Sequence, residues 1–349
     1  MMEKIRKYQQ GDAPAIARFM DEYFPRDKSA IIKRSRSAEY YEWKFGPNPF
    51  GKVIMYLYLE DDEIFGIYGA IPEPVSIRNQ EVLAYQLVDA FVAPHMHGKG
   101  IFRKLANLVF DEIDTYSKIS FGMSPSEFSL PIFEKKYDMY VALTYRQVFS
   151  PLRFDDILKA KGMGLISPLG SIVNPIKRGL FRVPRIHIEE VGDIPSNYFC
   201  SPSSAADFSV LRNEKYVSFR YISSPESYRY FIARDDTVDV VIIVKFVEWR
   251  GIRLCYFVDV IGKLNTESDN LCIIKALQEI GEKTGAALVS VELHATKKDS
   301  LKFKRYGFLF HSREDCLFMR QTKWPFLVPS SNEYDPERWV LFSGDADYI

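Results

Sequence analysis

Residues 87 to 105 read LVDAFVAPHMHGKGIFRKL, and the spacing of the apolar residues changes within this stretch. Up to Pro94 the segment is a β-prone run that extends a strand region beginning at Gln80. From residue 101 onward the apolar residues recur at helical spacing, at Ile101, Leu105, Leu108, Val109 and Ile113. The stretch therefore predicts a strand, a short loop with two glycines, and a helix.

The loop between this strand and this helix has the composition of a phosphate-binding turn. Gly98 and Gly100 allow the backbone to approach a ligand closely. The first amides of a helix have no partner inside the helix, and they carry partial positive charge. Lys99 and Arg103 add charge near the same place. The sequence therefore predicts a pyrophosphate site at the start of the helix.

The segments around the loop complete an alternating β and α order within residues 1–150. We expect Asp12 to cap a first helix, and Asp61 and Asp62 to form a turn between two strands. The predicted strands are 4–8, 53–59, 64–70, 80–93, 119–123 and 141–149, and the predicted helices begin at 12, 100 and 124. The order is β-α-β-β-β-α-β-α-β.

Several short motifs recur in the second half of the chain, between 169 and 176 residues further on. The slow drift of this offset indicates a duplicated domain with small loop deletions. We expect domains at 1–150 and 205–325, a connector at 151–204 and a tail at 326–349. The paired motifs are Trp43-Lys44-Phe45 with Phe219-Arg220-Tyr221, Asp61-Asp62 with Asp235-Asp236, Leu87-Val88-Asp89 with Phe257-Val258-Asp259, and Lys136-Tyr137-Asp138-Met139 with Arg305-Tyr306-Gly307-Phe308.

The 87–105 segment resembles the cofactor loop of GNAT acetyltransferases, which reads Gln/Arg-x-x-Gly-x-Gly/Ala between a strand and a long helix. Gly98 and Gly100 match the glycines, Leu105 matches the helix anchor, and His95 stands where the family has Gln or Arg. The later segment FEKKYDMY, residues 133–140, resembles the family's Leu-Tyr-x-Lys-x-Gly-Phe close. The resemblance covers residues 3–149 well and 205–320 loosely.

The resemblance implies an α/β fold of two tandem GNAT-like domains, each with a mostly antiparallel sheet, two splayed parallel strands and flanking helices. It also implies transfer of an acyl group, usually acetyl from acetyl-CoA, to an amine. The pantetheine arm would pair with the backbone of Phe91 and Val92. Ser126 matches a polar position that touches the cofactor, and a helix N-cap explains it equally well. The pyrophosphate would lie on His97, Gly98, Lys99, Gly100, Ile101, Phe102 and Arg103.

The catalytic groups are less well defined by the resemblance. The family's usual tyrosine acid aligns with Phe133, and the nearest tyrosines are Tyr137 and Tyr140. Asp89 is a candidate base or amine-holding group. Asp259 occupies the matching position in the second half, so Asp89 is equally a candidate for a structural role.

The second half shows no comparable cofactor loop. Its sequence after Asp259 has no Gly-x-Gly, and it carries Glu267 and Asp269, which would repel a pyrophosphate. We therefore expect this domain to pack against the first and to shape the acceptor pocket without binding coenzyme A.

Composition restricts the partners. Lysine plus arginine and aspartate plus glutamate are both 46, which argues against a nucleic-acid partner. The four cysteines form no Cys-x-x-Cys pair, so we expect neither a metal nor a disulfide framework. Apolar runs are too short to span a membrane and the start lacks a signal peptide, which predicts a cytoplasmic protein without a membrane partner.

These observations favour an N-acetyltransferase acting on a small-molecule amine, such as an amino sugar or an amino-acid derivative. A non-catalytic CoA-binding or regulatory module is the first alternative. An aminoacyl-transfer enzyme of the Fem type, which uses charged tRNA, is the second. The sequence leaves open whether the protein forms a homo-oligomer.

Overall fold

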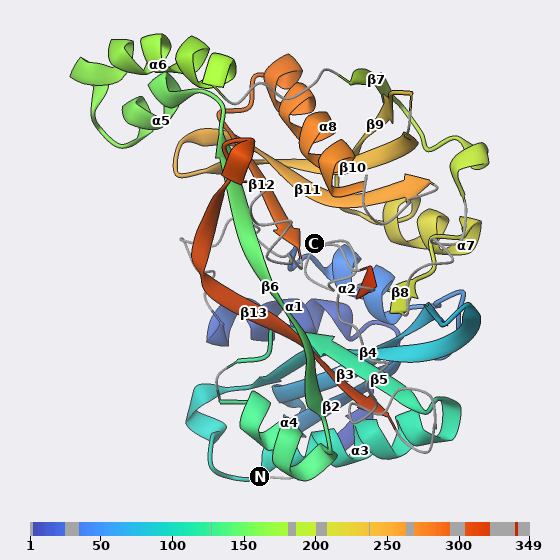
Figure 1. Cartoon of the computed structure of the whole chain (residues 1–349). Coiled ribbons are helices and arrows are strands. Elements are labelled where there is room, and N and C mark those ends of the chain that lie inside the picture. Colours follow the sequence, from blue (N-terminus) through green and yellow to red (C-terminus); the bar gives the residue numbers. More distant parts are fainter. Residues whose placement is uncertain are drawn as a thin grey trace.

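The computed structural model describes residues 3–24, 35–126, 128–180, 186–199, 208–236, 238–262, 269–293, 304–321 and 339–340. A mixed sheet flanked by helices runs through both halves of the molecule (Figure 1). Its strand order is β1-β2-β3-β4-β5-β13-β6-β12-β11-β10-β9-β7. The predicted α/β class is therefore confirmed.

The first half contains the predicted elements and one more helix. A helix at residues 38–45 was not predicted, because its eight residues mix aromatic and charged side chains without a clear apolar stripe. Its start is fixed by Ser37, whose side chain accepts a hydrogen bond from the Tyr40 amide at 3.1 Å. The elements are β1 (Glu3–Lys7), α1 (Ala13–Tyr23), α2 (Ala38–Phe45), β2 (Ile54–Glu60), β3 (Glu63–Ile77), β4 (Gln80–Val92), α3 (Ile101–Tyr116), β5 (Ile119–Met123), α4 (Leu130–Tyr137) and β6 (Tyr140–Pro151).

One helix start agrees with the prediction in position, and another differs from it. Asp12 occupies the N-cap position of α1, but its carboxylate makes no cap bond and instead pairs with Arg6 at 2.6 Å. The last helix begins at Leu130 rather than at residue 124, because Ser124 has a φ of 50° and turns the chain out of β5.

The second half repeats this succession of connections. The antiparallel strands β9, β10 and β11 are followed by α8 and by β12, which is parallel to β11. A duplicated domain would have the same order of strands and helix as the first half. The order is thus compatible with a duplication, which stays a prediction. The elements are α5 (Phe154–Ala160), α6 (Ser167–Leu180), β7 (His187–Val191), β8 (Phe208–Val210), α7 (Glu214–Val217), β9 (Arg229–Arg234), β10 (Asp239–Trp249), β11 (Ile252–Gly262), α8 (Asp269–Thr284), β12 (Leu288–Leu293), β13 (Leu309–Gln321) and β14 (Trp339–Val340).

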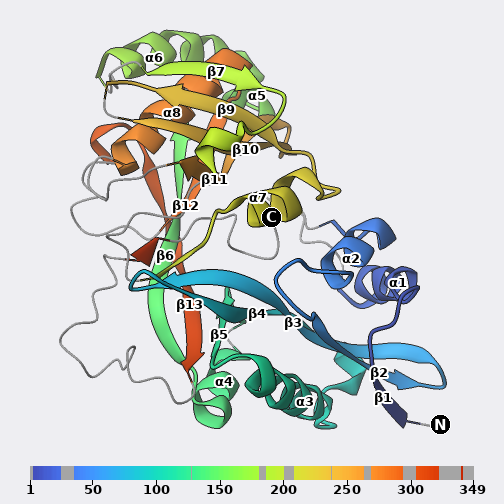
Figure 2. The ribbon, with the colours of Figure 1, turned by 90° about the vertical axis from the view of Figure 1, so that its right-hand side faces the viewer.

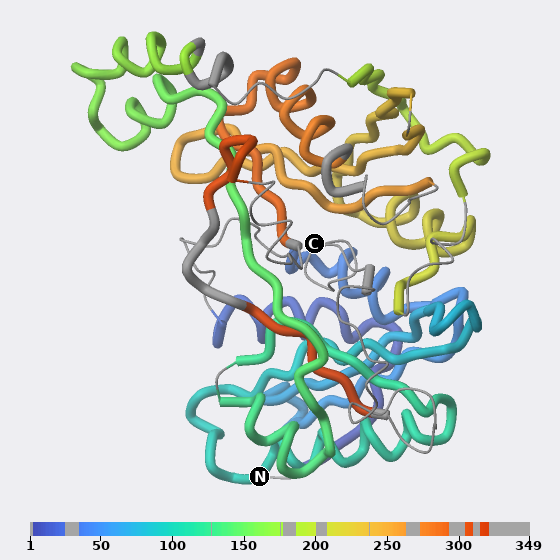
Figure 3. The backbone as a smooth tube through the Cα atoms, in the orientation of Figure 1, coloured from blue at the N-terminus to red at the C-terminus, as the bar shows by residue number. Residues whose placement is uncertain are grey.

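Two long strands join the halves. β13 lies between β5 and β6, while β6 lies between β13 and β12, so each half receives a strand from the other. Figure 3 shows the two strands running side by side from one half to the other. The predicted boundary at residue 150 therefore falls within β6, one residue before its end.

The helices cover both faces of the sheet. Figure 2 shows α1 and α2 on one side of the first-half strands and α3 and α4 on the other. A buried cluster between the halves contains residues of both, including Phe121, Tyr145, Tyr216 and Tyr256. The two halves are thus held together by a common apolar core as well as by the shared strands.

Candidate active site

The loop between β4 and α3 is a tight turn with two glycines in the left-handed region. Gly98 has a φ of 81° and Gly100 a φ of 76°, which other residues adopt only with strain. A Cβ atom at either position would meet no atom within 4 Å. The glycines are therefore needed for the backbone conformation, and the space in front of them is open.

The second part of this turn and the start of α3 contain a run of backbone amides without a hydrogen-bond partner among the described residues. The Met96 and His97 amides donate to the carbonyls of Ala93 and Pro94, and the next amide with a partner is that of Lys104, which donates to Gly100. In the described part of the chain, no hydrogen bond uses the amides of residues 98 to 103. This run of donors at a helix start is the arrangement that binds phosphate oxygens.

Side chains fix the loop and give it charge. His97 Nε2 lies 2.9 Å from the carbonyl oxygen of Val92, which ties the turn to the end of β4. Lys99 is exposed and its ammonium lies 3.1 Å from the Met96 sulfur, and Arg103 is exposed on the first turn of α3. His95 does not join them, since its ring packs between Tyr23 and Phe65 with centroid separations of 5.4 and 5.3 Å.

The parallel strands β4 and β5 separate beside this loop. Their pairing covers only Tyr85 with Ser120 and Gln86 with Phe121, although both strands continue beyond these residues. The Ala93 amide donates to Phe65 on β3, so the polar backbone groups of Val92 point away from β3. Phe91 and Val92, where the pantetheine arm was predicted, thus lie beyond the β4–β5 pairing, and the Val92 carbonyl lies 2.9 Å from His97 Nε2.

Asp89 lies in a bulge of β4, with a φ of 49°. Its carboxylate is buried and lies 2.5 Å from the buried ammonium of Lys44 on α2. Lys44 therefore lies in the protein interior and not at the surface. Asp259 is also buried and bonded, to Arg212 at 2.9 Å and to Tyr221.

The two predicted tyrosines differ in their surroundings. Tyr137 stacks on Phe110 and donates to Asn107 Oδ1 at 2.8 Å, and burial raises its pKa. Tyr140 begins β6, and burial raises its pKa to about 12. Phe133, which aligns with the family's tyrosine, is buried and stacks on Phe318 of β13 with centroids 4.9 Å apart.

A third tyrosine near this site was not predicted. Tyr68 on β3 is fully buried, and its ring stacks on Phe102 and lies 6.3 Å from the ring of Phe133. In the described part of the chain its hydroxyl has no hydrogen-bond partner, and burial raises its pKa well above 10. No feature of the sequence distinguishes Tyr68 from other residues of this strand. Its position depends on how β3 pairs in the sheet, because this pairing decides which residues of β3 face α3.

The end of β5 carries a second pair that the sequence did not indicate. The hydroxyl of Ser124 lies 2.5 Å from that of Tyr145 on β6, and the Ser124 amide donates to the carbonyl of Cys316 on β13. The hydroxyl of Ser126 donates to Ser129 Oγ and accepts from the Ser129 amide, in the turn before α4. The N-cap residue of α4 is Ser129, so the N-cap interpretation of Ser126 is wrong, and its contact with the cofactor stays a prediction.

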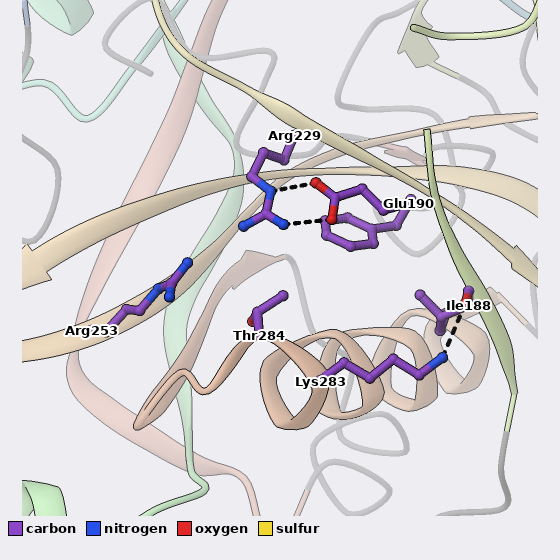
Figure 4. A pocket seen from close by; sticks show the side chains of 7 residues that line it. Ile188, Glu190, Arg229, Arg253, Lys283 and Thr284 are labelled. Atoms are coloured by element: carbon purple, nitrogen blue, oxygen red, sulfur yellow. Dashed lines mark hydrogen bonds and ion pairs between the residues drawn. The ribbon is translucent and has the colours of Figure 1, made fainter. Parts of the chain in front are cut away.

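Two surface cavities lie away from the loop. One, of about 280 Å³, lies in the second half between β7, β9, β11 and α8 (Figure 4). There Arg229 makes two hydrogen bonds to Glu190, which lower the pKa of that carboxyl group. The other, of about 320 Å³, lies between α1 and the β2–β3 turn.

Several predictions of absence concern metal sites, disulfides, membrane-spanning helices and a second cofactor loop. Among the described residues no group of His, Cys, Asp and Glu side chains has the arrangement of a metal site. Cys255 and Cys316 are free thiols. No described helix is long and apolar enough to cross a membrane. The predicted absence of a cofactor loop in the second half, with Glu267 and Asp269, concerns side chains outside the described residues.

The loop, the separated strands and the strand order together are those of the GNAT fold. Residues 4–136 match the acetyltransferase (GNAT) domain family, so the chain carries a GNAT acetyltransferase domain. The resemblance predicted from the 87–105 segment is confirmed over this range. A search by sequence among curated proteins gives no match.

Solved structures support the fold over most of the chain. The GCN5-related N-acetyltransferase from Anabaena variabilis ATCC 29413 is 13% identical and has a TM-score of 0.58, over 92% of this chain and 73% of its own. The N-myristoyltransferase of Saccharomyces cerevisiae with bound myristoyl-CoA is 10% identical with a TM-score of 0.59, over 91% and 82%. A probable N-acyltransferase from Enterococcus faecalis V583 is 12% identical with a TM-score of 0.58, over 92% and 73%.

Proposed function

We propose that the protein transfers an acetyl group from acetyl-CoA to the amine of a small molecule, such as an amino sugar or an amino-acid derivative. The observation that carries this proposal is the run of uncommitted amides at residues 98 to 103, next to two left-handed glycines. Such a turn holds a diphosphate through backbone donors. The exposed cations Lys99 and Arg103 complement the same charge.

The separation of β4 from β5 supplies the second part of the site. The thioester brings the acyl group, and transfer joins the amine nitrogen to the acyl carbon while the carbon–sulfur bond breaks. The thiol leaves with the proton that the amine releases. The backbone of Phe91 and Val92 would align the donor in the opening, and holding both reactants there supplies much of the rate.

Tyr68 is the residue that we favour as hydrogen-bond donor toward the leaving sulfur. Its hydroxyl is buried without a partner in the described structure and lies beside Phe133, which takes the family's tyrosine position. A phenol with a strongly raised pKa keeps its proton, so it would stabilise developing charge rather than release a proton. Tyr140, Tyr137 and Asp89 remain candidates for the proton transfers, although Tyr137 and Asp89 already have partners.

The second half is proposed to be a degenerate copy that forms the acceptor side. Asp259, the predicted counterpart of Asp89, is likewise buried and ion-paired, which supports this proposal, although its partner is Arg212 and not Arg220, the predicted counterpart of Lys44. We further propose a reducing, cytoplasmic setting, supported by the free buried thiol of Cys255.

Thiol release from acetyl-CoA with a panel of amines tests the proposal. Turnover on at least one amine is expected. Tight acetyl-CoA binding without turnover would instead favour the non-catalytic module, and absence of CoA binding by calorimetry would remove both. Myristoyl-CoA belongs in the panel, because a similar fold holds that donor in the Saccharomyces cerevisiae structure.

A further inference from the structure

The helical hairpin α5–α6 exposes its apolar residues to solvent. In Figure 1 it projects from the upper edge of the molecule, beyond α8. Leu165, at the turn between the two helices, is 100% exposed. Along the hairpin, from 40% to 60% of each of the following side chains is exposed: Met163, Ile166, Leu169, Ile172, Val173 and Ile176.

Leu169, Ile172 and Ile176 form a stripe on the face of α6 that points away from α5, and Leu165, in the turn before the helix, continues it. The spacing 165, 169, 172 and 176 places their side chains within one narrow sector of a helix. The face that contacts α5 is instead small or polar. A Cβ at Gly170 would lie 2.3 Å from the Asp155 amide, and Asn174 accepts a hydrogen bond from the Phe154 amide at 2.8 Å.

The usual arrangement of an amphipathic helix is therefore reversed. A surface helix normally buries its apolar stripe against its own protein, and contiguous exposed apolar patches mark a contact with something else. The helix α5 packs against the other face of α6 and does not cover the stripe. An apolar surface outside the described structure would therefore be needed to bury it.

The charge pattern indicates which phase. From residue 157 to residue 188 the sequence has six lysines and arginines and no aspartate or glutamate. Lys159 and Lys161, next to the apolar turn, are exposed. The nearest acidic residues, Asp155 and Asp156, lie in the first turn of α5, where Asp155 bonds to Asn174 and Asp156 pairs with Arg153. Lys159 lies within 4.0 Å of both carboxylates, so Lys161 is the exposed cation here that has no acidic partner among the described residues. An apolar stripe next to a segment with six cations and two acidic residues over positions 155 to 188 complements a bilayer that contains anionic lipids.

We propose that α5 and α6 dock the protein on the surface of an anionic phospholipid bilayer, with the apolar stripe in the acyl boundary and the lysines at the headgroups. This is peripheral binding in the plane of the membrane, and it does not depend on the proposed acyl transfer. The helix lies on the bilayer without crossing it, in agreement with the absence of a spanning helix among the described residues.

Co-sedimentation of the full-length protein with lipid vesicles tests this proposal. Binding to phosphatidylcholine vesicles with 30 mol% phosphatidylglycerol should exceed binding to pure phosphatidylcholine by at least about tenfold at low salt. It should fall steeply at 0.5 M NaCl, because salt screens the lysines. Equal, negligible binding to both vesicle types would overturn the proposal.

Variants separate the stripe from the rest of the surface. Leu169→Ser/Ile172→Ser should abolish binding to the anionic vesicles, while Gln9→Ser/Gln10→Ser, at exposed positions of the first half, should not change it. Circular dichroism and thiol-release activity without lipid should stay unchanged in both. Wild-type binding by the stripe variant, or a wild-type dimer that the stripe variant converts to a monomer, would contradict membrane docking; the second result would assign the stripe to another copy of the chain.

Discussion

The indole ring of Trp43 on α2 stacks on the ring of Phe219, with centroids 5.2 Å apart and planes 21° apart, and its Nε1 donates to the Phe219 carbonyl at 3.2 Å. The two residues are 176 positions apart and begin the paired motifs Trp43-Lys44-Phe45 and Phe219-Arg220-Tyr221. The stack therefore joins α2 of the first half to the segment after α7 in the second half.

A double-mutant cycle on this stack should give a favourable coupling. For Trp43→Ala and Phe219→Ala, we expect a coupling free energy of about 0.5–1.5 kcal/mol, as for other stacked aromatic pairs. Urea unfolding of the wild type, both single variants and the double variant measures it. Strict additivity would show that the stack contributes nothing to the joining of the halves.

Gly98→Glu should abolish CoA binding while leaving the fold largely intact. The change adds bulk and negative charge in front of the uncommitted amides, where no atom lies within 4 Å of the new Cβ. Gly98→Ala is the matched control, because it has the same backbone strain of about 1 kcal/mol without the charge. Calorimetry with CoA and thermal unfolding of both variants measure the two effects. Wild-type affinity in the glutamate variant would mean that the loop is not the phosphate site.

Tyr68→Phe should separate catalysis from stability. Because the buried hydroxyl has no partner in the described structure, its removal should leave the melting temperature unchanged or raise it. If Tyr68 donates to the leaving sulfur, kcat should fall by at least about tenfold. Tyr58→Phe is the control: it removes a hydroxyl of β2 that donates to Glu60 on the same strand, and it should leave kcat unchanged. A fully active Tyr68→Phe enzyme would exclude the proposed role.

Breaking the Asp89–Lys44 pair should mainly affect stability. Lys44→Met removes the ammonium that lies 2.5 Å from the buried Asp89 carboxylate and should cost about 3–5 kcal/mol, and Lys44→Met/Asp89→Leu should recover most of that loss. Urea unfolding measures both. An Asp89→Asn enzyme that keeps its melting temperature but loses kcat would support the alternative, in which Asp89 is the base.

Alkaline pH should unfold the protein between pH 10 and pH 12. Burial raises the pKa of Tyr140, Tyr85 and Tyr228 from 10 to about 12. Their contribution to stability is therefore complete below pH 10, where the unfolded phenols are protonated, and is lost as the pH rises toward 12. The phenolate absorbance at 295 nm should rise together with the loss of the circular-dichroism signal. Full ionisation of these tyrosines in a folded protein would contradict their burial.

Much of the site could be predicted from the sequence because its parts are local. The change of apolar period at Pro94, and the glycines 98 and 100, fix a strand, a left-handed turn and a helix within twenty residues. Such elements depend on neighbours in the chain, and their geometry creates the free amides directly. The Asp61–Asp62 turn, where both residues have positive φ, was predictable for the same reason.

Other features depended on contacts between distant residues. The sequence indicates that 141–149 is a strand, but only the assembled sheet decides that β6 pairs with β12 and β13. The partner of Asp89 and the burial of Tyr68 likewise follow from packing across the sheet. The exposed stripe of α6 shows the physical reason most clearly: apolar spacing establishes that a helix has an apolar face, whereas the direction of that face depends on which side packs against α5.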